Sequence, residues 1–393
     1  MASAAPKIII QKDEGQTPSW REFLFYFLKL GWAGFGDPEA RINRMARQVV
    51  KRSWLSPEHL ARVCEFCRLL PGPQELLTVI HVGYLKRKVV GGLLAGLLFV
   101  LPGALLMIVI SSLYVAYATT PQGKAFLFIL KPAALGVLLG ATVKLGAAAI
   151  RNYFLALLML AAAAALSLGE LNLILILLGA GTINALVCDG QLRLQRRLTQ
   201  AIFVLPAVLL ALPFLHPHWL RMFWLFLKTG FLSFAGATTS LAFLYQGAYQ
   251  EHHWISEAQL LDALAFSLVL PGPSLLFSTF AGYLAGGPVG AIVATGFVFL
   301  PAFLLVLFAA RHSEKFSRNK MLQSFISGVT AAVVGVVISV AIDLAPEALQ
   351  KTAAVVLTIG CFLAVVVRKI EAVFVAAAAV IGGVIYAYVI TGA

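Results

Sequence analysis

The sequence predicts an all-α polytopic membrane protein, and its composition, its long apolar runs and an internal repeat lead to this fold class. Of its 393 residues, 60% are hydrophobic and only 12% are charged, against roughly 45–50% and about 25% in typical soluble domains. Apolar runs such as 89–117 and 203–215 match membrane-spanning helices, which need about 20 residues, or fewer where the bilayer is thin. The runs do not alternate in polarity, which excludes an outer-membrane β-barrel. The composition excludes cytosolic, secreted and nucleic-acid-binding proteins.

One pattern of motifs occurs twice, with the two copies about 199 residues apart. Trp54-Leu-Ser returns as Trp254-Ile-Ser, Leu70-Pro-Gly-Pro as Leu270-Pro-Gly-Pro, and Gly83-Tyr as Gly282-Tyr. Because the matches keep their order along both halves, we interpret the halves as homologous repeats.

The repeat divides the chain into four parts. They are a polar cytoplasmic tail (1–19), a first repeat (20–190), a basic linker with one extra transmembrane helix (191–216), and a second repeat (217–393). Each repeat contains a short apolar segment, a polar stretch, a segment broken at Pro-Gly-Pro, and four long helices. The long helices are expected at 89–117, 126–150, 153–168 and 171–187, and at 287–310, 324–344, 351–368 and 371–391.

The distribution of basic residues predicts that the second repeat is inverted in the membrane. The net charge is +13, and Lys and Arg collect in cytoplasmic loops. The polar stretch of the first repeat is rich in arginine, whereas the equivalent stretch 246–262 has acids but no Lys or Arg. The N-terminus is therefore predicted to be cytoplasmic, and the C-terminus is predicted on the opposite side.

This placement requires that four segments enter the membrane and return without crossing it, namely 21–35, 63–84, 220–235 and 263–283. Non-helical backbone at membrane depth is tolerated where it is buried in protein or lines a polar cavity. Re-entrant pieces from both faces therefore predict a central site.

The Pro-Gly-Pro motifs are candidates for an anion-binding site. Proline removes a backbone donor and glycine permits a sharp bend, so the half-helix after each motif presents free N–H groups that favour an anion. Discontinuous helices in paired inverted repeats point to the substrate site of a transporter. The substrate-binding candidates from these motifs are Pro71, Gly72, Pro73, Pro271, Gly272 and Pro273.

Ionisable residues in apolar segments supply further candidates, because such residues are costly in a membrane. Lys144 and Asp343 occupy equivalent positions of the repeats, so they either form an ion pair or face separate halves of a polar pathway. Arg68 beside the first motif suits an oxyanion. Glu65 and Glu75 either carry a proton or balance the charge of Arg68. We predict that Lys144 and Arg68 bind the substrate, and that Asp343, Glu65 and Glu75 take part in proton coupling.

Enzymatic chemistry has little support in the sequence. The four cysteines are too few and too scattered for a disulfide scaffold or a zinc site. Cys64 and Cys67 form a C-x-x-C pair that would permit redox chemistry on a helix, but no nicotinamide, flavin or haem motif accompanies it. We therefore expect no enzyme activity, no cofactor and no metal.

At three places the sequence resembles the chromate ion transporter family in its long two-domain form. Phe35-Gly-Asp-Pro-Glu-Ala-Arg-Ile is similar to the family's Phe-Gly-Gly-Pro-x-Ala-His-Ile, and Leu69-Leu-Pro-Gly-Pro is followed by the matching pattern from Gly92 to Ala104. The resemblance covers nearly the whole chain from Trp20 onward. It implies a prokaryotic inner-membrane protein that exports chromate with the proton-motive force, as an antiporter, with sulfate as a chemical mimic.

Two positions depart from the family motif. Asp37 replaces a glycine and Arg41 replaces a histidine, and the second copy, Phe234-Ala-Gly236-Ala, lacks the proline. Asp37 and Arg41 either pair, since they are four residues apart, or add an acid and a base to the cavity. On this resemblance Gly36, Gly236 and Arg41 are substrate candidates, and Asp37 is a candidate for proton coupling.

The leading functional hypothesis is a secondary active transporter for a tetrahedral divalent oxyanion, coupled to protons and working by alternating access. The alternative is an anion channel that uses the same half-helix ends as a filter. The expected partners are the oxyanion, protons and the lipid bilayer, with no nucleic acid. A monomer and a homodimer both remain open.

Overall fold

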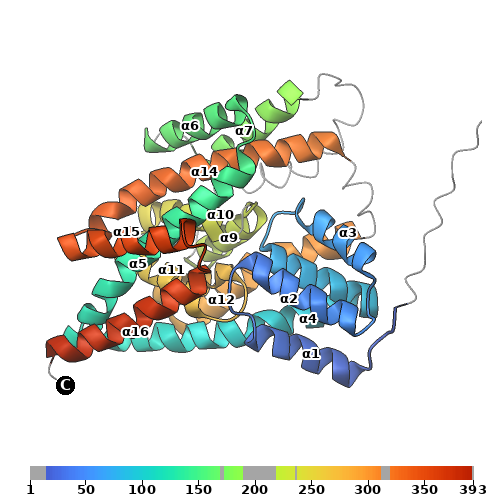
Figure 1. Ribbon diagram of the computed structural model, residues 1–393, viewed down its shortest axis with the longest axis horizontal. Helices are drawn as coiled ribbons and strands as arrows, with labels where there is room; N and C mark the ends of the chain where they lie inside the picture. Colours follow the sequence, from blue (N-terminus) through green and yellow to red (C-terminus); the bar gives the residue numbers. More distant parts are fainter. Residues whose placement is uncertain (1–14, 169–171, 189–217, 235–236, 311–318, 392–393) are drawn as a thin grey trace, which may run out of the picture.

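The regular structure of the described chain is helical (Figure 1). The computed structural model describes residues 15–168, 172–188, 218–234, 237–310 and 319–391, and these contain fourteen α-helices, a π-helix and a 3-10 turn. The first half contains α1 (Trp20–Trp32), α2 (Pro38–Lys51), α3 (Pro57–Cys67), α4 (Gln74–Tyr117), α5 (Pro121–Ala149), α6 (Tyr153–Ser167) and α7 (Leu173–Cys188). The second half contains α9 (His218–Phe231), α10 (Ala237–Leu244), η1 (Tyr245–Glu251), α11 (Glu257–Val269), η2 (Ser274–Leu276), α12 (Phe277–Ala309), α14 (Lys320–Ala348), α15 (Thr352–Val366) and α16 (Ala372–Thr391).

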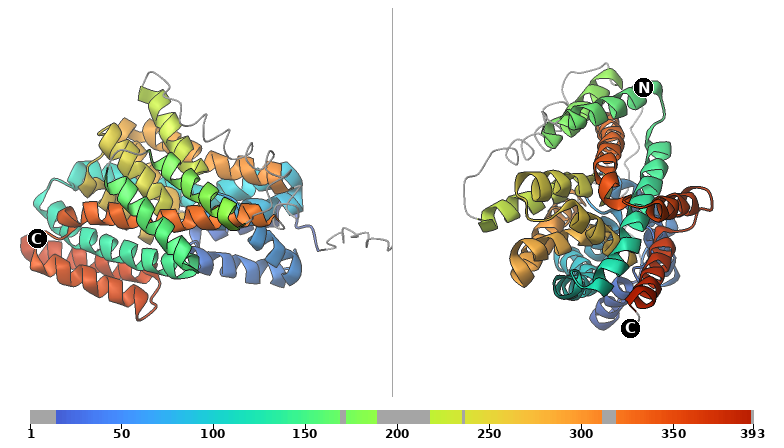
Figure 2. Two further views of the ribbon diagram at one scale, coloured as in Figure 1. Left: turned by 90° about the horizontal axis from the view of Figure 1, so that it is seen from above. Right: turned by 90° about the vertical axis from the view of Figure 1, so that its left-hand side faces the viewer.

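Five of the described helices are long and apolar enough to cross a membrane: α4, α5, α12 together with η2, α14 and α16. In Figure 1, α4, α14 and α16 extend roughly along the long axis of the molecule and α5 rises obliquely across it, while α1, α2 and α3 gather at the right-hand side. The left view of Figure 2 likewise shows α1 and the C-terminal helix α16 at opposite ends. Large apolar side chains on the outside of these helices are exposed, for example Ile292 and Phe308 on α12 and Ile381 on α16. A lipid environment covers such side chains at no cost, so the protein is a multi-pass membrane protein.

The two halves share a helical hairpin with the same backbone break. Inside α4, the non-helical residues Arg87 and Lys88 have φ/ψ of −139°/24° and 56°/−150°. Inside α12, Gly286 and Gly287 have −153°/26° and 64°/−157°. The two helical arms on either side of each break pack closely. In α4, a Cβ added to Gly83 would lie only 2.6 Å from the Gly91 carbonyl oxygen, so only glycine fits there. This agreement in detail indicates that the repeats share a fold as well as a sequence pattern.

The segments that begin the repeats also contact the hairpins in matching ways. The guanidinium of Arg87 lies 4.5 Å from the ring centre of Trp20. At the equivalent place of the second half, Trp219 packs against Gly286. The contact is so close that a Cβ added to Gly286 would lie 3.1 Å from the Trp219 ring. Each break is therefore anchored by the tryptophan that starts its own repeat.

The expected long helices are present with small differences in their bounds. α14 exceeds the expected 324–344 at both ends, because the Asn319 side chain accepts a hydrogen bond from the Leu322 N–H and starts the helix early. The expected polar stretch of the second half contains η1. The expected linker helix near 201–215 and residues 1–14 of the expected tail lie outside the described residues, and Gln16 of the tail donates its N–H to the Ser53 carbonyl.

Candidate functional site

The two Pro-Gly-Pro segments lie between helices, and each is hydrogen-bonded to the other half of the chain at a place that we call the crossing (Gly34, Gly72, Ser233 and Gly272). α3 ends at Cys67 and α4 begins at Gln74, while α11 ends at Val269 and η2 begins at Ser274. The Gly72 N–H donates to the Ser233 carbonyl (2.9 Å), and the Gly272 N–H donates to the Gly34 carbonyl (3.0 Å). Each motif is therefore joined to the end of the first helix of the other half, and the two hydrogen bonds occupy equivalent positions.

The glycine conformation explains why this motif recurs. Gly72 has φ +130° and Gly272 has φ +104°, a region that side chains with a Cβ rarely adopt. The flanking prolines Pro71, Pro73, Pro271 and Pro273 are all buried. The turn buries its backbone and still directs the glycine N–H groups across the interface between the halves.

A buried ion pair lies beside this crossing. Arg41 Nη1 donates to Glu75 Oε1 at 3.1 Å, and the two side chains are 5% and 2% exposed. The same oxygen accepts the backbone N–H and the hydroxyl of Ser274, both at 3.3 Å. Three donors from both halves of the chain therefore converge on one carboxylate oxygen.

Local structure positions both members of the pair. Arg41, Met45 and Val49 form the buried face of α2, which packs on α4. Glu75 lies in the first turn of α4, directly after the first motif. Burial lowers the pKa of the Arg41 guanidinium, and the Glu75 carboxylate opposes that effect.

A small cavity adjoins the pair and is lined by residues of α1, α2, α4 and the turn after α1, among them Gly34, Arg44 and Phe99. Its volume is about 10 Å³, which is enough for roughly one water molecule. Arg41 Nε is buried without a hydrogen-bond partner among the described residues. The site thus holds an unused donor and too little space for a tetrahedral oxyanion while Glu75 remains in place.

The other candidate residues lie apart from the pair. Gly36 is buried with φ +102° and adjoins Glu371, and Asp37 precedes α2 as its N-cap. Arg41 pairs with Glu75, so of the two alternatives for Asp37 and Arg41 the ion pair between them is not the one formed. Gly236 lies outside the described residues.

The remaining charged candidates are exposed. Arg68 and Glu65 lie on the surface at the end of α3, so Glu75 balances Arg41 and not Arg68. Lys144 on α5 and Asp343 on α14 are also exposed, and no ion pair joins them within the described ranges. Sequence reasoning did not identify Ser274 or Ser233, whose role depends on contacts between the halves.

A second, larger cavity of about 480 Å³ lies between the end of α4, the start of α5, α11 and the end of α14. Tyr114 donates its hydroxyl to Asp262 Oδ2 at 2.8 Å. Lys131 Nζ of α5 lies 2.9 Å from Glu347 Oε1 of α14, and the two side chains form an ion pair. The sequence singled out Asp262 only as one of the acids that mark its side of the membrane.

The cysteine pair has the features of packing residues. Cys64 and Cys67 are free thiols, and burial raises the pKa of both, which disfavours the reactive thiolate. Cys67 Sγ lies 3.8 Å from Nδ1 of buried His81. The described residues contain no group of three or more His, Cys, Asp and Glu side chains that could hold a metal ion.

Comparison with known proteins adds to this geometry. The pattern of the chromate transporter family matches residues 21–185 and 220–384. The chromate transport protein of Pseudomonas aeruginosa is 32% identical over 365 residues, which cover 88% of this chain and 86% of the relative. That of Cupriavidus metallidurans is 29% identical over 380 residues, 94% of each chain. A probable chromate transport protein of Synechococcus elongatus is 28% identical over 338 residues, 84% of this chain and 86% of the relative.

No solved structure matches the chain. The family pattern nevertheless covers both halves, at positions that coincide with the two structural repeats. The Pseudomonas relative aligns along most of the chain. The chain therefore belongs to the chromate transporter family, with two copies of the family domain, and is a transporter-family protein and not an enzyme.

Proposed function

We propose that this chain is a proton-coupled secondary active transporter that exports chromate, or a related tetrahedral divalent oxyanion such as sulfate, across a prokaryotic inner membrane. The observation that carries the proposal is the Glu75 carboxylate held by Arg41 and Ser274. A guanidinium, a backbone N–H and a hydroxyl are the donors that bind oxyanions. The relatives named as chromate transport proteins supply the substrate class.

In this proposal the Glu75 carboxylate and the oxyanion compete for the same donors. The adjoining cavity of about 10 Å³ is too small for the substrate, so Glu75 must leave Arg41 before an oxyanion binds. The displaced carboxylate would remain buried beside a divalent anion, which strongly disfavours its charge. Glu75 therefore takes up a proton when the oxyanion binds, and this exchange links substrate to proton.

The positions of the two hairpin breaks support inverted repeats. The second arm of α4 begins after the break at Arg87 and Lys88 and ends at Tyr117. The residues that follow α4, Ala118 and Thr119, line the same cavity as Leu284, which lies just before the break of α12. The two breaks are thus at opposite ends of the second arm of α4, roughly 40 Å apart at about 1.5 Å per residue.

Basic residues favour the cytoplasm for the face that carries the break of α4. The break itself contains Arg87 and Lys88, and Arg44 and Arg47 of α2 line an open cavity with Glu371 from the connection between α15 and α16. Because Lys and Arg mark cytoplasmic loops, we place α2 inside and the Tyr114–Asp262 cavity outside. Relative movement of the halves about the crossed motifs would expose Arg41 to each side in turn.

Chromate flux in proteoliposomes under an imposed pH gradient tests this function, with sulfate, phosphate and molybdate as competitors. We expect flux that responds to the gradient and that sulfate inhibits. Flux of similar size without any response to the gradient indicates the alternative, an anion channel. No chromate flux from folded protein would contradict the assigned substrate.

Replacing Glu75 with Gln is expected to make oxyanion affinity independent of pH. In the wild type the proposed oxyanion-bound state holds one more proton than the free state, so affinity falls as pH rises. Glutamine keeps an acceptor for Arg41 but has no charge. Sulfate, whose charge is constant near neutral pH, is the ligand of choice, and its affinity is measured by calorimetry across about pH 6 to 9.

Glu65→Gln is the matched control, because Glu65 is exposed on α3 and does not contact Arg41. This variant should retain the pH dependence of the wild type. Sulfate should also raise the melting temperature of Glu75→Gln more than that of the wild type, since Arg41 then lacks its resident anion. A Glu75→Gln variant with unchanged pH dependence would refute competition at this site.

A further inference from the structure

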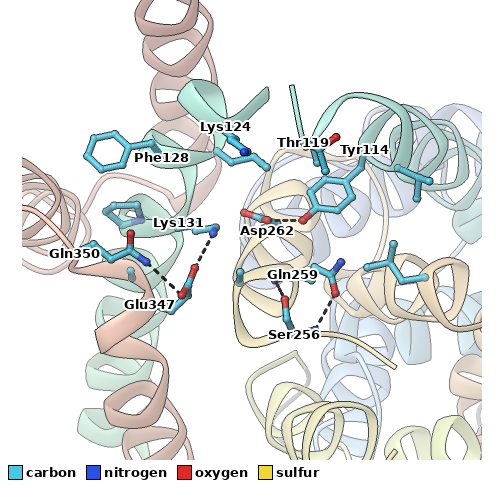
Figure 3. A pocket seen from close by; sticks show the side chains of 17 residues that line it. Tyr114, Thr119, Lys124, Phe128, Lys131, Ser256, Gln259, Asp262, Glu347 and Gln350 are labelled. Atoms are coloured by element: carbon cyan, nitrogen blue, oxygen red, sulfur yellow. Dashed lines mark hydrogen bonds and ion pairs between the residues drawn. The ribbon is translucent and has the colours of Figure 1, made fainter. Parts of the chain in front are cut away.

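The cavity of about 480 Å³ at the proposed outer face is lined by a buried carboxyl group that forms no ion pair with any described residue (Figure 3). Asp262 of α11 is 0% exposed. Its Oδ2 accepts the hydroxyl hydrogen of Tyr114, while its Oδ1 has no partner among the described residues. Lys131 is committed to Glu347 at 2.9 Å. A buried carboxylate in this state carries an uncompensated charge, and binding a proton removes it.

Four other helices line the cavity around Asp262. α4 supplies Tyr114, α5 supplies Lys124 and Lys131, and α14 supplies Glu347; α12 contributes the apolar Leu284. Burial raises the pKa of Asp262 to about 7, and the charge of Lys131 and the hydrogen bond from Tyr114 oppose this shift. α11 is a thirteen-residue helix and is too short to cross a bilayer, and Asp262 lines the cavity from this helix.

The cavity of about 480 Å³ has room for water, and Asp262 is one of its lining residues although its side chain is itself buried. It is lined by polar side chains on several sides, including Ser256, Gln259 and Gln350. It shares no lining residue with the small cavity at Arg41 and Glu75. The Asp262 carboxyl group is therefore a second titratable site, separate from the oxyanion site.

We propose that Asp262, held by Tyr114, is a proton-binding site through which the coupling proton enters or leaves the transport cycle at the outer face. This inference rests on the proposed proton-coupled transport. The step is reversible: the carboxylate gains an O–H bond to a proton delivered by cavity water, and the acid returns that proton to water. Tyr114 keeps its own hydrogen and orients the carboxyl group in both states.

The site exists in only one of the two repeats. The first-repeat position equivalent to Asp262 is Arg62, which is exposed on α3. Duplication of the fold has thus not duplicated the carboxyl group. A proton site on one face alone gives the two faces of the transporter different chemistry.

Asp262→Asn in proteoliposomes tests the inference, with Glu257→Gln as the control on the same helix. Asparagine has the same shape and accepts the Tyr114 hydrogen bond, so folding should be retained. We expect chromate–sulfate exchange without a gradient to stay within about threefold of wild type, while flux driven by a pH gradient falls at least about tenfold. Glu257→Gln should keep both activities.

The outcomes separate the two proposals. If the wild type shows no gradient-driven chromate flux, the proposed function fails. If the wild type shows it and Asp262→Asn retains it, the proton site at Asp262 is overturned. Infrared difference spectra between about pH 5.5 and 8.5 give a readout that does not need transport: a titrating carboxylic acid band should be present in the wild type and absent in Asp262→Asn. Its presence in the variant would also overturn the inference.

Tyr114→Phe gives an independent test if Asp262→Asn does not fold. The Tyr114 hydrogen bond stabilises the charged carboxylate, so its loss should shift the infrared titration to higher pH by about half to one unit. An unchanged titration, or a shift to lower pH, would contradict the assigned contact between Tyr114 and the titrating group.

Discussion

Arg41→Ala is expected to reduce chromate transport more than about 100-fold, because it removes the charged donor of the site and leaves Glu75 buried without a counter-charge. Breaking a buried ion pair from one side costs about 3–5 kcal/mol, and each tenfold in affinity or rate corresponds to about 1.4 kcal/mol. Arg41→Lys keeps the charge but loses the planar guanidinium with its several N–H donors, so a smaller loss of transport is expected than for Arg41→Ala. Initial rates of chromate flux in proteoliposomes measure both variants.

The matched control is Arg47→Ala. Arg47 lies on the same helix, is exposed, and lines the open cavity beside Glu371 rather than the buried pair. Its replacement should change the flux by less than about threefold, in line with a surface charge. Equal losses in the two variants would indicate a general electrostatic effect, and near-normal flux in folded Arg41→Ala would exclude a substrate role for Arg41.

Gly72→Ala and Gly272→Ala are each expected to reduce transport at least about tenfold while membrane insertion is retained. The reason is conformational, since the nearest side-chain atoms to an added Cβ are 3.4 Å away at Gly72 and 3.3 Å away at Gly272. A residue with a Cβ at φ +130° or +104° is strained by about 1–3 kcal/mol. Relief of that strain rotates the N–H away from Ser233 or Gly34 and loosens the crossing.

Gly296→Ala on α12 is the control for these substitutions. No atom lies within 4 Å of a Cβ at Gly296, and glycine to alanine in a helix interior stabilises by about 1 kcal/mol. Flux and thermal stability in detergent should match or exceed the wild type. If all three variants behave alike, the positive-φ turns are not required for transport.

Much of the fold was predictable because its signals are local. Apolar runs fixed the long helices to within a few residues, and the repeat identified their correspondence. The proline and glycine residues around Gly72 and Gly272 act through their own backbone angles. For that reason the sequence also located the ends of α3 and α11 at these motifs.

The pairing of charges could not be predicted, because it depends on contacts between distant elements. A spacing of four residues left a pair of Asp37 and Arg41 as one of two alternatives, but α2 packs on α4 and brings Glu75 to Arg41 instead. Proximity to the first Pro-Gly-Pro motif favoured Arg68 as the residue that binds the oxyanion, but Arg68 is exposed at the end of α3. Ser274 reaches Glu75 only because the two halves cross.

The number of protons taken up when chromate binds is the most direct test of competition between Glu75 and the substrate. Calorimetry of the detergent-solubilised wild type at about pH 8, where chromate is divalent, yields this number from the binding enthalpies in buffers of different ionisation enthalpy. We expect about one proton taken up per chromate, and none with Glu75→Gln. Chromate binding to the wild type without proton uptake would contradict displacement and protonation of Glu75.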